Sequence, residues 1–376
     1  MNGQKLSILI IMPYLDRFEG SKLGLAICSS LSSMGHDVEL LINECQENII
    51  VNIEKAIGKT NLEILRRKPQ LAYGKIYALK YYITSLADRS IVNHIVREEK
   101  HYDIVLVIAN EGLNIAKLIE KKYHGKLFVA MLIQDPPLNN VLNYREPRGI
   151  FEFLKGALKG AFFSMNRKKI RRKLQIFQAL FANSFWTKQI VEYVFGVNIK
   201  SILNAYLPQD LTVKDEINNP YIAVPTVALN ETGVKTIEEL RKRGINLRIF
   251  GKMDIKGSMG YISTPEMVNL ISQASATLFL FDYEGLGLIP IESLSLGTPV
   301  ITEPKLAPFS ELVDNPNVMF FNDVDDLEAL CRKVLTTPKT QELRDRCKLS
   351  VSRFVPVRAA DELIRVYLNS IKEKVI

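Results

Sequence analysis

The sequence predicts an α/β fold of two doubly wound parallel sheets, one in each of two domains. Short apolar runs typical of buried strands alternate along the chain with longer stretches of helical periodicity. The length of 376 residues is enough for two domains that each bury a substantial core. Hydrophobic residues make up 47% of the chain and charged residues 24%, which is ordinary for a globular protein.

The first domain is expected to span residues 1–205. Continuous apolar runs predict buried strands at Leu6–Met12, Asp37–Ile42, Ile104–Ile108, Leu127–Leu132, Leu180–Ala182 and Ser201–Leu203. Residues 45–100 carry few strand signals and therefore predict a long helical insertion. Cys28 lies on the first predicted helix, where a buried free thiol is expected.

The second domain is expected to span residues 206–356. Its apolar runs predict strands at Ile222–Leu229, Leu247–Phe250, Ala276–Phe281, Pro299–Thr302 and Val318–Phe321. The tail from Asp326 predicts helices, the first of them with Asp325 as its N-cap. Capping therefore explains the acid triplet Asp323-Val-Asp325 better than a metal site does, and residues 357–376 predict a final helix.

A strand, a glycine loop and a short helix form the most informative segment of the chain. The predicted strand Ala276–Phe281 is followed by a loop that contains Gly285 and Gly287. Pro290 predicts the start of a helix, because a proline at the first helical position loses no hydrogen bond. Gly297 predicts where that helix ends.

Two carboxylates flank this turn, Glu284 in the loop and Glu292 in the first turn of the predicted helix. Ligands of open α/β sheets bind beyond the carboxyl ends of the strands, where this turn would lie. The N–H groups of Gly287 and Leu288, at a helix N-terminus, can meet a phosphate or a sugar hydroxyl. A carboxylate accepts hydrogen bonds from two neighbouring hydroxyls, so Glu284 suits a hexose and Glu292 a ribose diol. The combination indicates a sugar-nucleotide site, which the glutamate spacing alone would not.

This segment resembles the Glu-x7-Glu signature of family 4 glycosyltransferases, retaining nucleotide-sugar-dependent enzymes of the GT-B fold. Further similar segments follow in the family's order: Ser7–Tyr14, Glu19–Ser21, Gly35–Leu41, Leu180–Thr187, Ile202–Ala205, Leu247–Gly251 and Met259–Ile262. The resemblance covers nearly the whole chain. It implies two Rossmann-like domains facing a cleft, with the final helix 357–376 packed back on the first domain.

The activity that the resemblance implies is transfer of a hexosyl-type unit from a nucleotide sugar to an acceptor hydroxyl, with retention and without a metal or cofactor. Glu284 is the expected catalytic-site carboxylate, and Asp135, in the first domain, is a candidate on the acceptor side. The donor is expected to contact Gly285, Gly287, Leu288, Glu292, Tyr261, Ile262, Lys252, Lys235, Gly20 and Ser21. Of these, Tyr261 and Ile262 would line the base pocket, and the two lysines would help to hold the diphosphate.

The chain departs from the family pattern at three positions. The family places an arginine and, five residues later, a lysine before a glycine of the second domain. With Gly233 as that glycine, these positions hold Val227 and Thr232. Gln134 stands where the family often has a histidine. These departures leave three functions open: a glycosyltransferase with a different donor, a catalytically silent partner subunit of the same shape, and a sugar-nucleotide epimerase of the same fold.

The charge of the chain is concentrated in its first half. Residues 1–205 hold 29 lysines and arginines against 18 acids, a net charge of +11, whereas the remainder holds 20 against 23, a net charge of −3. Residues 150–173 combine apolar side chains at helical spacing with six cations in the seven residues 167–173. This pattern favours a helix in the headgroup layer of an anionic membrane, and equally an amphipathic helix packed on the first domain with its cations in solvent. A nucleic-acid partner is not expected, because no binding-module signature accompanies the basic run.

Several classes of protein are excluded or disfavoured. The four histidines do not cluster with other ligating residues, so no metal site is expected. Gly20 and Ser21 lack the full glycine fingerprints of dehydrogenases and P-loop enzymes. Four dispersed cysteines suit a reducing compartment. No apolar run reaches the roughly 18 residues that span a bilayer. We therefore expect a cytoplasmic protein, free or peripheral on the inner face of the membrane, where a lipid-linked saccharide could be the acceptor.

Overall fold

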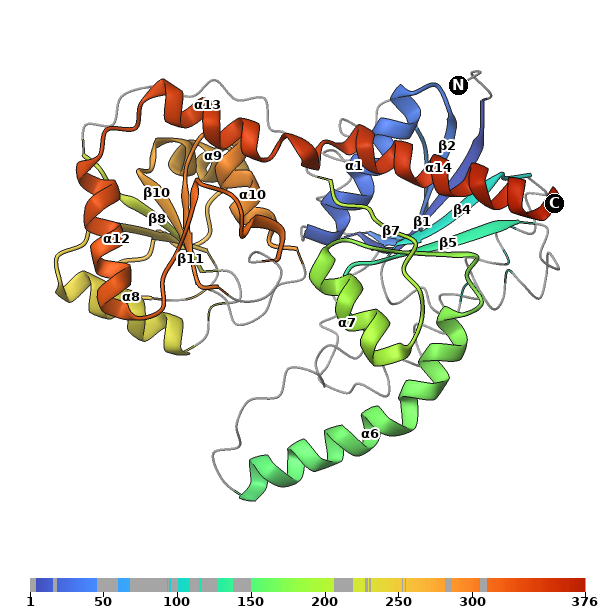
Figure 1. The fold of residues 1–376 in the computed structure, drawn as a ribbon, viewed down its shortest axis with the longest axis horizontal. Coiled ribbons are helices and arrows are strands. Elements are labelled where there is room, and N and C mark those ends of the chain that lie inside the picture. The colour runs from blue at the N-terminus through green and yellow to red at the C-terminus, as the bar shows by residue number, and fades with distance from the viewer. Residues whose placement is uncertain are drawn as a thin grey trace. The chain divides into compact units, whose positions relative to one another are not determined.

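The structure is a computed structural model of the chain. It describes residues 5–15, 19–45, 60–67, 93, 95, 101–108, 115, 119, 127–137, 150–205, 219–226, 229, 231–251, 253, 255–280, 286–304 and 310–375. The chain divides into two compact units (Figure 1). Unit 1 consists of Met1–Leu207 together with Val355–Ile376, and unit 2 consists of Pro208–Phe354.

Unit 1 is built on a seven-stranded parallel sheet with the order β3-β2-β1-β4-β5-β6-β7. Its strands are β1 (Ser7–Leu15), β2 (Asp37–Cys45), β3 (Asn61–Arg67), β4 (Ile104–Ile108), β5 (Phe128–Ile133), β6 (Ala179–Ala182) and β7 (Ser201–Ile202). The strand order reverses direction between β1 and β4. This reversal is the switch point at which a doubly wound sheet leaves a crevice beyond its carboxyl edge.

Helices cover both faces of this sheet: α1 (Glu19–Ser33), α6 (Ile150–Leu174), α7 (Phe185–Phe195) and α14 (Pro356–Val375). Successive side chains of a strand point to opposite faces. Ile8 and Ile10 of β1 belong to the core under α1 and α14, and Leu9 and Ile11 to the core under α6 and α7. Burial on both faces explains why these strands are continuous apolar runs in the sequence.

The C-terminal helix α14 belongs to the core of unit 1. Its Ala360 and Leu363 are fully buried in the same cluster as α1, and α14 packs along α1 (Figure 1). The ring of Tyr367 meets the ring of Phe128 edge-on, with 5.3 Å between the centroids. The Tyr367 hydroxyl lies 3.5 Å from Asp103 Oδ1.

The expected helical insertion at 45–100 is wrong in part, because Asn61–Arg67 forms the edge strand β3, paired with β2. Polar and apolar residues alternate over residues 61–64 of β3, and Leu62 and Ile64 pack against the core. An edge strand with one solvated face gives no continuous apolar run. For that reason the sequence did not indicate a strand here.

Unit 2 is built on a five-stranded parallel sheet with the order β12-β11-β10-β8-β9. Its strands are β8 (Ile222–Pro225), β9 (Leu247–Phe250), β10 (Ala276–Phe279), β11 (Val300–Thr302) and β12 (Val318–Phe320). Its helices are α8 (Glu231–Lys242), α9 (Thr264–Gln273), α10 (Leu288–Ser295), α12 (Val324–Thr336) and α13 (Gln341–Ser350), followed by the 3-10 turn η2 (Ser352–Phe354). The switch point of this sheet lies between β8 and β10.

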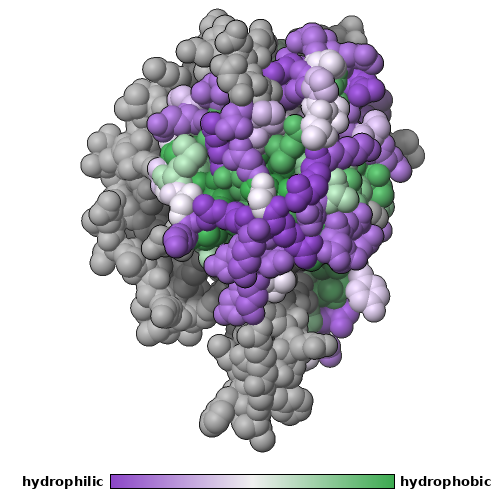
Figure 2. Space-filling model, turned by 90° about the vertical axis from the view of Figure 1, so that its left-hand side faces the viewer, coloured by the Kyte–Doolittle hydropathy of each residue, from purple (hydrophilic) through white to green (hydrophobic). Residues whose placement is uncertain are grey.

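A charged cluster joins α8 to α12. Arg243 Nη1 donates to Asp325 Oδ1 at 2.6 Å and to Glu328 Oε2 at 2.7 Å, while its Nε donates to Glu239 at 3.0 Å. Arg332 also donates to Glu328, at 2.7 Å. Figure 2 views the molecule from the side on which α8 and α12 lie in Figure 1. On this face, hydrophilic residues surround apolar ones. Contacts with Arg243 and Arg332 lower the pKa of Glu328.

Two predicted helix starts need correction. The N-cap of α12 is Asp323 and not Asp325, because the Asp323 carboxylate accepts hydrogen bonds from the N–H groups of Asp325 and Asp326. Helix α10 begins at Leu288, two residues before Pro290. The first four N–H groups of a helix have no intrahelical partner, so a proline loses no bond at the third position either. Glu292 is therefore the fifth residue of α10 and lies just beyond its first turn.

Other expectations are confirmed. The six strands predicted in the first half and the five in the second all form, and residues 150–173 lie within α6. Cys28 is a buried free thiol, as are Cys331 and Cys347. Burial raises the pKa of Cys28 to about 12, so this thiol stays protonated at neutral pH.

Candidate functional site

The topology of unit 2 places two strand ends side by side at the carboxyl edge of its sheet. Strands β8 and β10 are neighbours in the sheet, and the switch point lies between them. The chain leaves β8 through Thr226 towards α8 and leaves β10 through Leu280 towards α10. Ligands of open parallel sheets bind in the crevice beyond such a pair of strand ends. The turn that the sequence singled out therefore lies where this fold places ligands.

The start of α10 supplies hydrogen-bond donors at this edge. Its N-cap residue Gly287 has φ 77° and ψ 64°, a left-handed conformation that a glycine adopts without steric cost. Gly287 has no side chain that could cap the helix. The N–H groups of Leu288 and Ile289 therefore have no intrahelical acceptor and point away from the helix. Together with the helix dipole they form an environment that favours an anion.

Glu292 is buried behind these donors, with an exposed fraction of 3%. Glu292 lies one helical turn after Leu288, so the two residues are on the same face of α10. Its backbone carbonyl accepts hydrogen bonds from Leu296 N–H at 3.0 Å and from the Ser295 hydroxyl at 2.7 Å. A carboxylate this deeply buried is held by ordered polar partners rather than by bulk water.

A buried polar scaffold holds α10 in place. The hydroxyls of Thr277 on β10 and Ser293 on α10 are 2.7 Å apart, and Ser293 also donates to the carbonyl of Thr298 at 3.0 Å. Lys339 Nζ donates to Thr298 Oγ1 at 2.5 Å, to Ser272 O at 2.7 Å and to Ala274 O at 2.9 Å. These bonds tie the strand, the end of α9 and the residues after α12 to the helix that begins at the site.

Burial, and then the charge of Arg344, lower the pKa of Lys339 to about 6. The three acceptors around Nζ match the three N–H groups of the ammonium form, whereas the neutral amine could donate to only two of them. Sequence inspection missed this scaffold. Lys339 and its hydroxyl partner Thr298 are 41 residues apart in the sequence, so no short motif indicates their contact.

The loop after β9 closes against Thr226, at the end of β8. Gly251 has φ 130°, and a Cβ at this position would lie 2.5 Å from Thr226 Oγ1 and 3.1 Å from Thr226 N. Gly251 N–H donates to Gly260 O at 2.9 Å, and Met253 N–H donates to Thr226 Oγ1 at 3.3 Å. Only a glycine allows this close approach of the two loops.

The segment that leads from this loop to α9 carries Tyr261 and Ile262. The side chain of Tyr261 is 62% exposed, whereas Ile262 packs against the cluster that contains Phe250 and Leu270. A capping box then starts α9, in which the Ser263 hydroxyl accepts from Glu266 N–H and the Glu266 carboxylate accepts from Ser263 N–H. The two predicted base-pocket residues thus differ, one being available to a ligand and the other part of the core.

The other predicted donor residues are dispersed. Lys235 and Thr232 are exposed on α8. In unit 1, Gly20 and Ser21 lie in the first turn of α1, beside the switch point between β1 and β4. Glu284, Gly285, Lys252 and Val227 lie outside the described residues. The described part of unit 2 therefore brings Gly287, Leu288 and Glu292 together and adds the nearby scaffold, whereas Lys235 lies on α8 and Tyr261 precedes α9.

Asp135 and a neighbour that sequence inspection did not select lie at the carboxyl edge of unit 1. Asp135 follows β5 by two residues and is partly buried. The carbonyl of Gln134 accepts from Thr187 Oγ1 at 3.5 Å, near the start of α7. Asn183 follows β6, and its buried Oδ1 has no hydrogen-bond partner among the described residues. An unpaired buried acceptor is rare in a folded protein, so Asn183 is a candidate site residue.

Comparison with known proteins gives one family match. Residues 257–353 match the model of the family described as glycosyl transferases group 1. This stretch lies within unit 2 and contains the start of α10, Glu292 and the buried scaffold. No curated protein matches the chain.

Solved structures resemble the chain over nearly its whole length. Sucrose-phosphate synthase from Thermosynechococcus elongatus has a TM-score of 0.72 at 11% identity and covers 98% of this chain and 100% of that one. HepE from Anabaena, solved with UDP and glucose, has a TM-score of 0.66 at 11% identity and covers 96% and 98%. WaaG, a glycosyltransferase involved in lipopolysaccharide biosynthesis, has a TM-score of 0.62 at 14% identity and covers 94% and 98%.

These likenesses confirm the predicted fold class, and the chain has the GT-B fold. The family match in unit 2 and the fold together support a GT-B glycosyltransferase.

Proposed function

We propose that the protein transfers a hexosyl-type unit from a nucleotide sugar to an acceptor hydroxyl, with retention at the anomeric carbon and without a resident metal or cofactor. One observation carries the proposal. The segment that matches the glycosyltransferase family contains the start of α10, where free N–H groups and the buried Glu292 meet at the switch point of the sheet. HepE, which shares the fold, was solved with UDP and glucose, and this supports a nucleotide-sugar donor.

Breaking a glycosidic bond to phosphate requires that a positive charge on the sugar be tolerated and a departing phosphate be stabilised. The N–H groups of Gly287 and Leu288 suit the departing phosphate because they are oriented before the reaction begins. We assign Glu284 to the sugar and Glu292 to the ribose, because a carboxylate accepts from two neighbouring hydroxyls. The exposed ring of Tyr261 would stack on the base.

The remaining assignments follow the resemblance. Gly285 and Ile262 would complete the donor pocket, with Lys252 or Lys235 as the cation near the diphosphate and Gly20 and Ser21 contributing backbone donors from unit 1. On the acceptor side we assign Asp135 and add Asn183, whose buried oxygen lacks a partner among the described residues. No general base is assigned, because in the resembled family the donor phosphate takes the proton of the acceptor.

A sugar-nucleotide hydrolysis assay tests this proposal. The pure protein should release nucleoside diphosphate from its donor, and Glu284→Ala should reduce the rate to background. Glu342→Ala, which removes an exposed glutamate of α13, is the matched control and should keep the rate. With an acceptor present, the anomeric configuration of the product, measured by NMR, tests retention.

A catalytically silent partner subunit is the second candidate. It is favoured by Thr232, which is exposed on α8 and stands where the resembled family places a phosphate-binding lysine. Background rates for both the unmodified protein and Glu284→Ala would support it, provided that the donor still stabilises the fold. A ligand at a hundred times its dissociation constant should raise the free energy of unfolding by about 2.7 kcal/mol. Sugar product formed without an acceptor would instead indicate the epimerase.

We also propose that unit 1 contacts an anionic membrane surface through residues 150–173, which suits a lipid-linked acceptor. The described part of the chain contains no helix long and apolar enough to cross a bilayer. Helix α6 turns Phe163, Ile170 and Leu174 towards the core of unit 1 and leaves Met165 78% exposed. WaaG, which shares the fold, acts in lipopolysaccharide biosynthesis, and this supports a saccharide acceptor. Flotation with vesicles at low salt tests the contact, and a protein that stays in the soluble fraction would refute it.

A further inference from the structure

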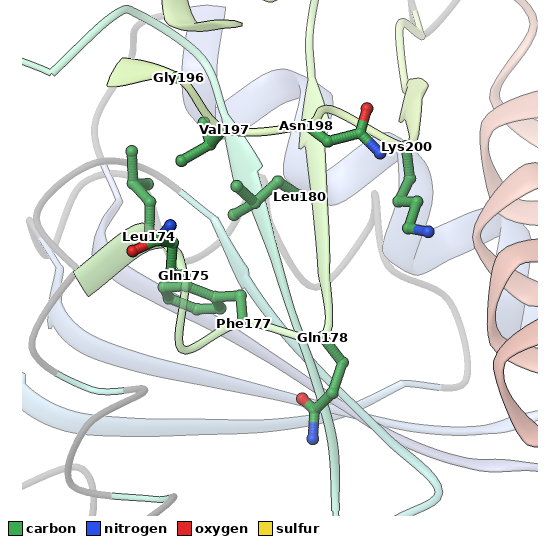
Figure 3. A pocket seen from close by; sticks show the side chains of 9 residues that line it. All are labelled: Leu174, Gln175, Phe177, Gln178, Leu180, Gly196, Val197, Asn198 and Lys200. Carbon is green, nitrogen blue, oxygen red and sulfur yellow. The ribbon is translucent and has the colours of Figure 1, made fainter. Parts of the chain in front are cut away.

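A cavity of about 390 Å³ lies at the foot of α6, at the amino ends of β6 and β7 (Figure 3). It is thus at the edge of the sheet opposite to Asp135 and Asn183. Its floor is formed by the buried apolar side chains of Leu174, Phe177 and Leu180, and its rim by the exposed Gln175, Asn198 and Lys200. A volume of this size is within the range of small-molecule sites, which combine an apolar lining with a few polar groups.

Hydrogen bonds fix the wall that follows α7. Gly196 ends the helix in the left-handed conformation, with φ 60°, and its N–H donates to Glu192 O at 2.9 Å. Glu192 Oε1 accepts from Ile199 N–H at 2.9 Å, and Lys200 N–H donates to Leu180 O at 2.8 Å. The segment 196–200 is therefore held in position before any ligand arrives.

The opposite wall is fixed in a similar way. The side-chain amide of Gln178 accepts from Val129 N–H and donates to Leu127 O, both at 2.7 Å. These bonds anchor the turn after α6 to β5. Figure 3 shows the two walls on either side of the cavity, with the turn that begins at Leu174 facing the segment that begins at Gly196. A cavity between two anchored segments binds without a large ordering cost.

Two cations lie at the wall of this cavity that is formed by residues 196–200. The guanidinium carbon of Arg171 lies 3.5 Å from the place that a Cβ on Gly196 would take, and Lys200 is on the rim. The last turn of α6 also carries Arg172 and Lys173. Within the described part of the chain, no carboxylate pairs with Arg171, Arg172 or Lys200. The only acid of α7, Glu192, is already engaged by Ile199 N–H and lies 3.9 Å from Lys188.

Apolar surface accompanies this charge. Helices α6 and α7 meet where the rings of Phe163 and Phe195 lie 6.3 Å apart. Close to this contact, Met165 on α6 is 78% exposed and Tyr193 on α7 is 86% exposed. Exposed tyrosine is typical of surfaces that lie at the headgroup level of a bilayer. A free phosphate would use the cations but not the apolar floor or these exposed side chains.

We propose that this cavity, together with Arg171 and Lys200, binds the phosphate headgroup of an anionic phospholipid. The cations would pair with the phosphate, the amides of Gln175 and Asn198 would bond the polar ester and glycerol oxygens, and the apolar floor would cover the glycerol carbons. The inference rests on the proposed membrane contact of unit 1 and not on the proposed chemistry. It places the lipid at the amino edge of the sheet, so that the carboxyl edge stays open to substrates.

Vesicle co-sedimentation of the full chain tests the proposal. The protein should sediment with vesicles of phosphatidylcholine and phosphatidylglycerol, and not with phosphatidylcholine alone. The double variant Arg171→Gln with Lys200→Gln should partition about thirtyfold less, because each cation contributes about 1 kcal/mol at an anionic surface. Arg358→Gln with Lys372→Gln, which removes two exposed cations of α14 in the same unit, is the matched control and should partition like the unmodified protein.

A soluble probe separates the headgroup from free phosphate. Glycerol phosphate should raise the melting temperature of the unmodified protein more than inorganic phosphate does, and Asn198→Trp, which blocks the rim without changing charge, should abolish the difference. If the two double variants partition equally onto vesicles, the proposal is overturned, because the attraction then comes from the overall charge of the protein and not from this cavity. If both phosphates stabilise the protein equally and it does not bind vesicles, the ligand is a free phosphate and not a lipid. If the protein binds RNA but not vesicles, the ligand is a nucleic acid.

These outcomes do not depend on catalysis, because no donor is present in either assay. Sugar-nucleotide hydrolysis, measured in parallel, should be the same for the double variant Arg171→Gln with Lys200→Gln and for the unmodified protein. Loss of vesicle binding with intact hydrolysis therefore tests the lipid site, and loss of hydrolysis with intact vesicle binding tests the proposed chemistry.

Discussion

The two units have the same architecture but differ in what their sequences place on it. Each is a parallel sheet whose strand order reverses beside its first strand. In unit 2 the reversal carries a glycine-started helix with a buried glutamate, and the glycosyltransferase family match covers this region. In unit 1 the helix at the reversal begins at Glu19 and carries Gly20 and Ser21 in its first turn, and the basic residues are concentrated on α6. The fold thus provides a switch point in each unit, whereas the side chains decide what each unit binds.

The net charge also differs between the two halves of the chain. Residues 1–205 carry a net charge of +11, and residues 206–376 carry −3. A uniformly basic protein would suggest only non-specific attraction to polyanions. Here the excess is concentrated in the half that contains α6, so we infer that unit 1 meets the anionic partner and unit 2 the activated sugar.

Removing the buried carboxylate of unit 2 should have the largest effect on its function. Glu292→Gln should lower kcat/KM for the sugar nucleotide about 10²- to 10³-fold, the usual effect of losing a preorganised polar contact in a buried site. Steady-state kinetics measures the effect, and circular dichroism should show an unchanged fold. Glu342→Gln, at an exposed position of α13, should keep full activity. If Glu292→Gln keeps full activity, Glu292 is not part of the donor site.

A second test asks how strongly the chain terminus contributes to unit 1. Leu363→Ala removes a fully buried side chain of α14 and should lower the free energy of unfolding by roughly 2–5 kcal/mol. Urea unfolding should show the loss in the transition of unit 1 alone. Val357→Ala, at a 45% exposed position of the same helix, should cost much less. An equal loss in the two variants would mean that α14 adds little to this core.

The scaffold of unit 2 predicts a dependence of stability on pH. The pKa of Lys339 falls from its ordinary 10.5 to about 6 on folding. Between these values the unfolded chain binds one proton more, so stability rises with pH, and it is lost as the pH falls towards 6. The slope should be about 1.4 kcal/mol per pH unit. Urea unfolding at about pH 7 and about pH 9 measures it.

Lys339→Met provides the comparison for that measurement. It retains much of the volume of the side chain but cannot be protonated, so this part of the pH dependence should disappear. Lys333→Met, at an exposed position of α12, should leave the slope unchanged. If Lys339→Met keeps the full slope, the proton is taken up elsewhere.

The smallest expected effect concerns the close approach of two loops in unit 2. Gly251→Ala should destabilise the protein by about 1–3 kcal/mol, because its Cβ would lie 2.5 Å from Thr226 Oγ1 and φ is 130°. Gly244→Ala is the matched control, since φ there is also positive, at 79°, but a Cβ would meet nothing within 4 Å. Differential scanning calorimetry should rank Gly251→Ala below Gly244→Ala. The reverse order would show that the loops separate easily.

Most of the fold could be predicted from the sequence, because a central strand that is buried on both faces is a continuous apolar run. Strand β3 escaped notice since it lies at an edge and alternates polar with apolar residues. The starts of α10 and α12 were displaced by two residues, because proline tolerates several first-turn positions and either of two aspartates could cap. Boundaries therefore depend on geometry that composition does not record.

The candidate site was predictable only where its residues are adjacent in sequence. Gly287, Leu288 and Glu292 were selected because they surround one turn. The support from Lys339 and Thr298 joins residues 41 positions apart, and the unpaired oxygen of Asn183 becomes visible only in three dimensions. The cavity at the foot of α6 likewise combines a helix end with the segment 196–200, which no linear motif connects.

The return of α14 to unit 1 has a consequence for biosynthesis. During translation, the residues of unit 2 leave the ribosome before the helix that covers α1. Until then the nascent first unit exposes the apolar side of α1, whereas unit 2 already has every strand and helix it needs. The later-made unit can therefore finish folding first, while the first unit is completed only when α14 covers α1.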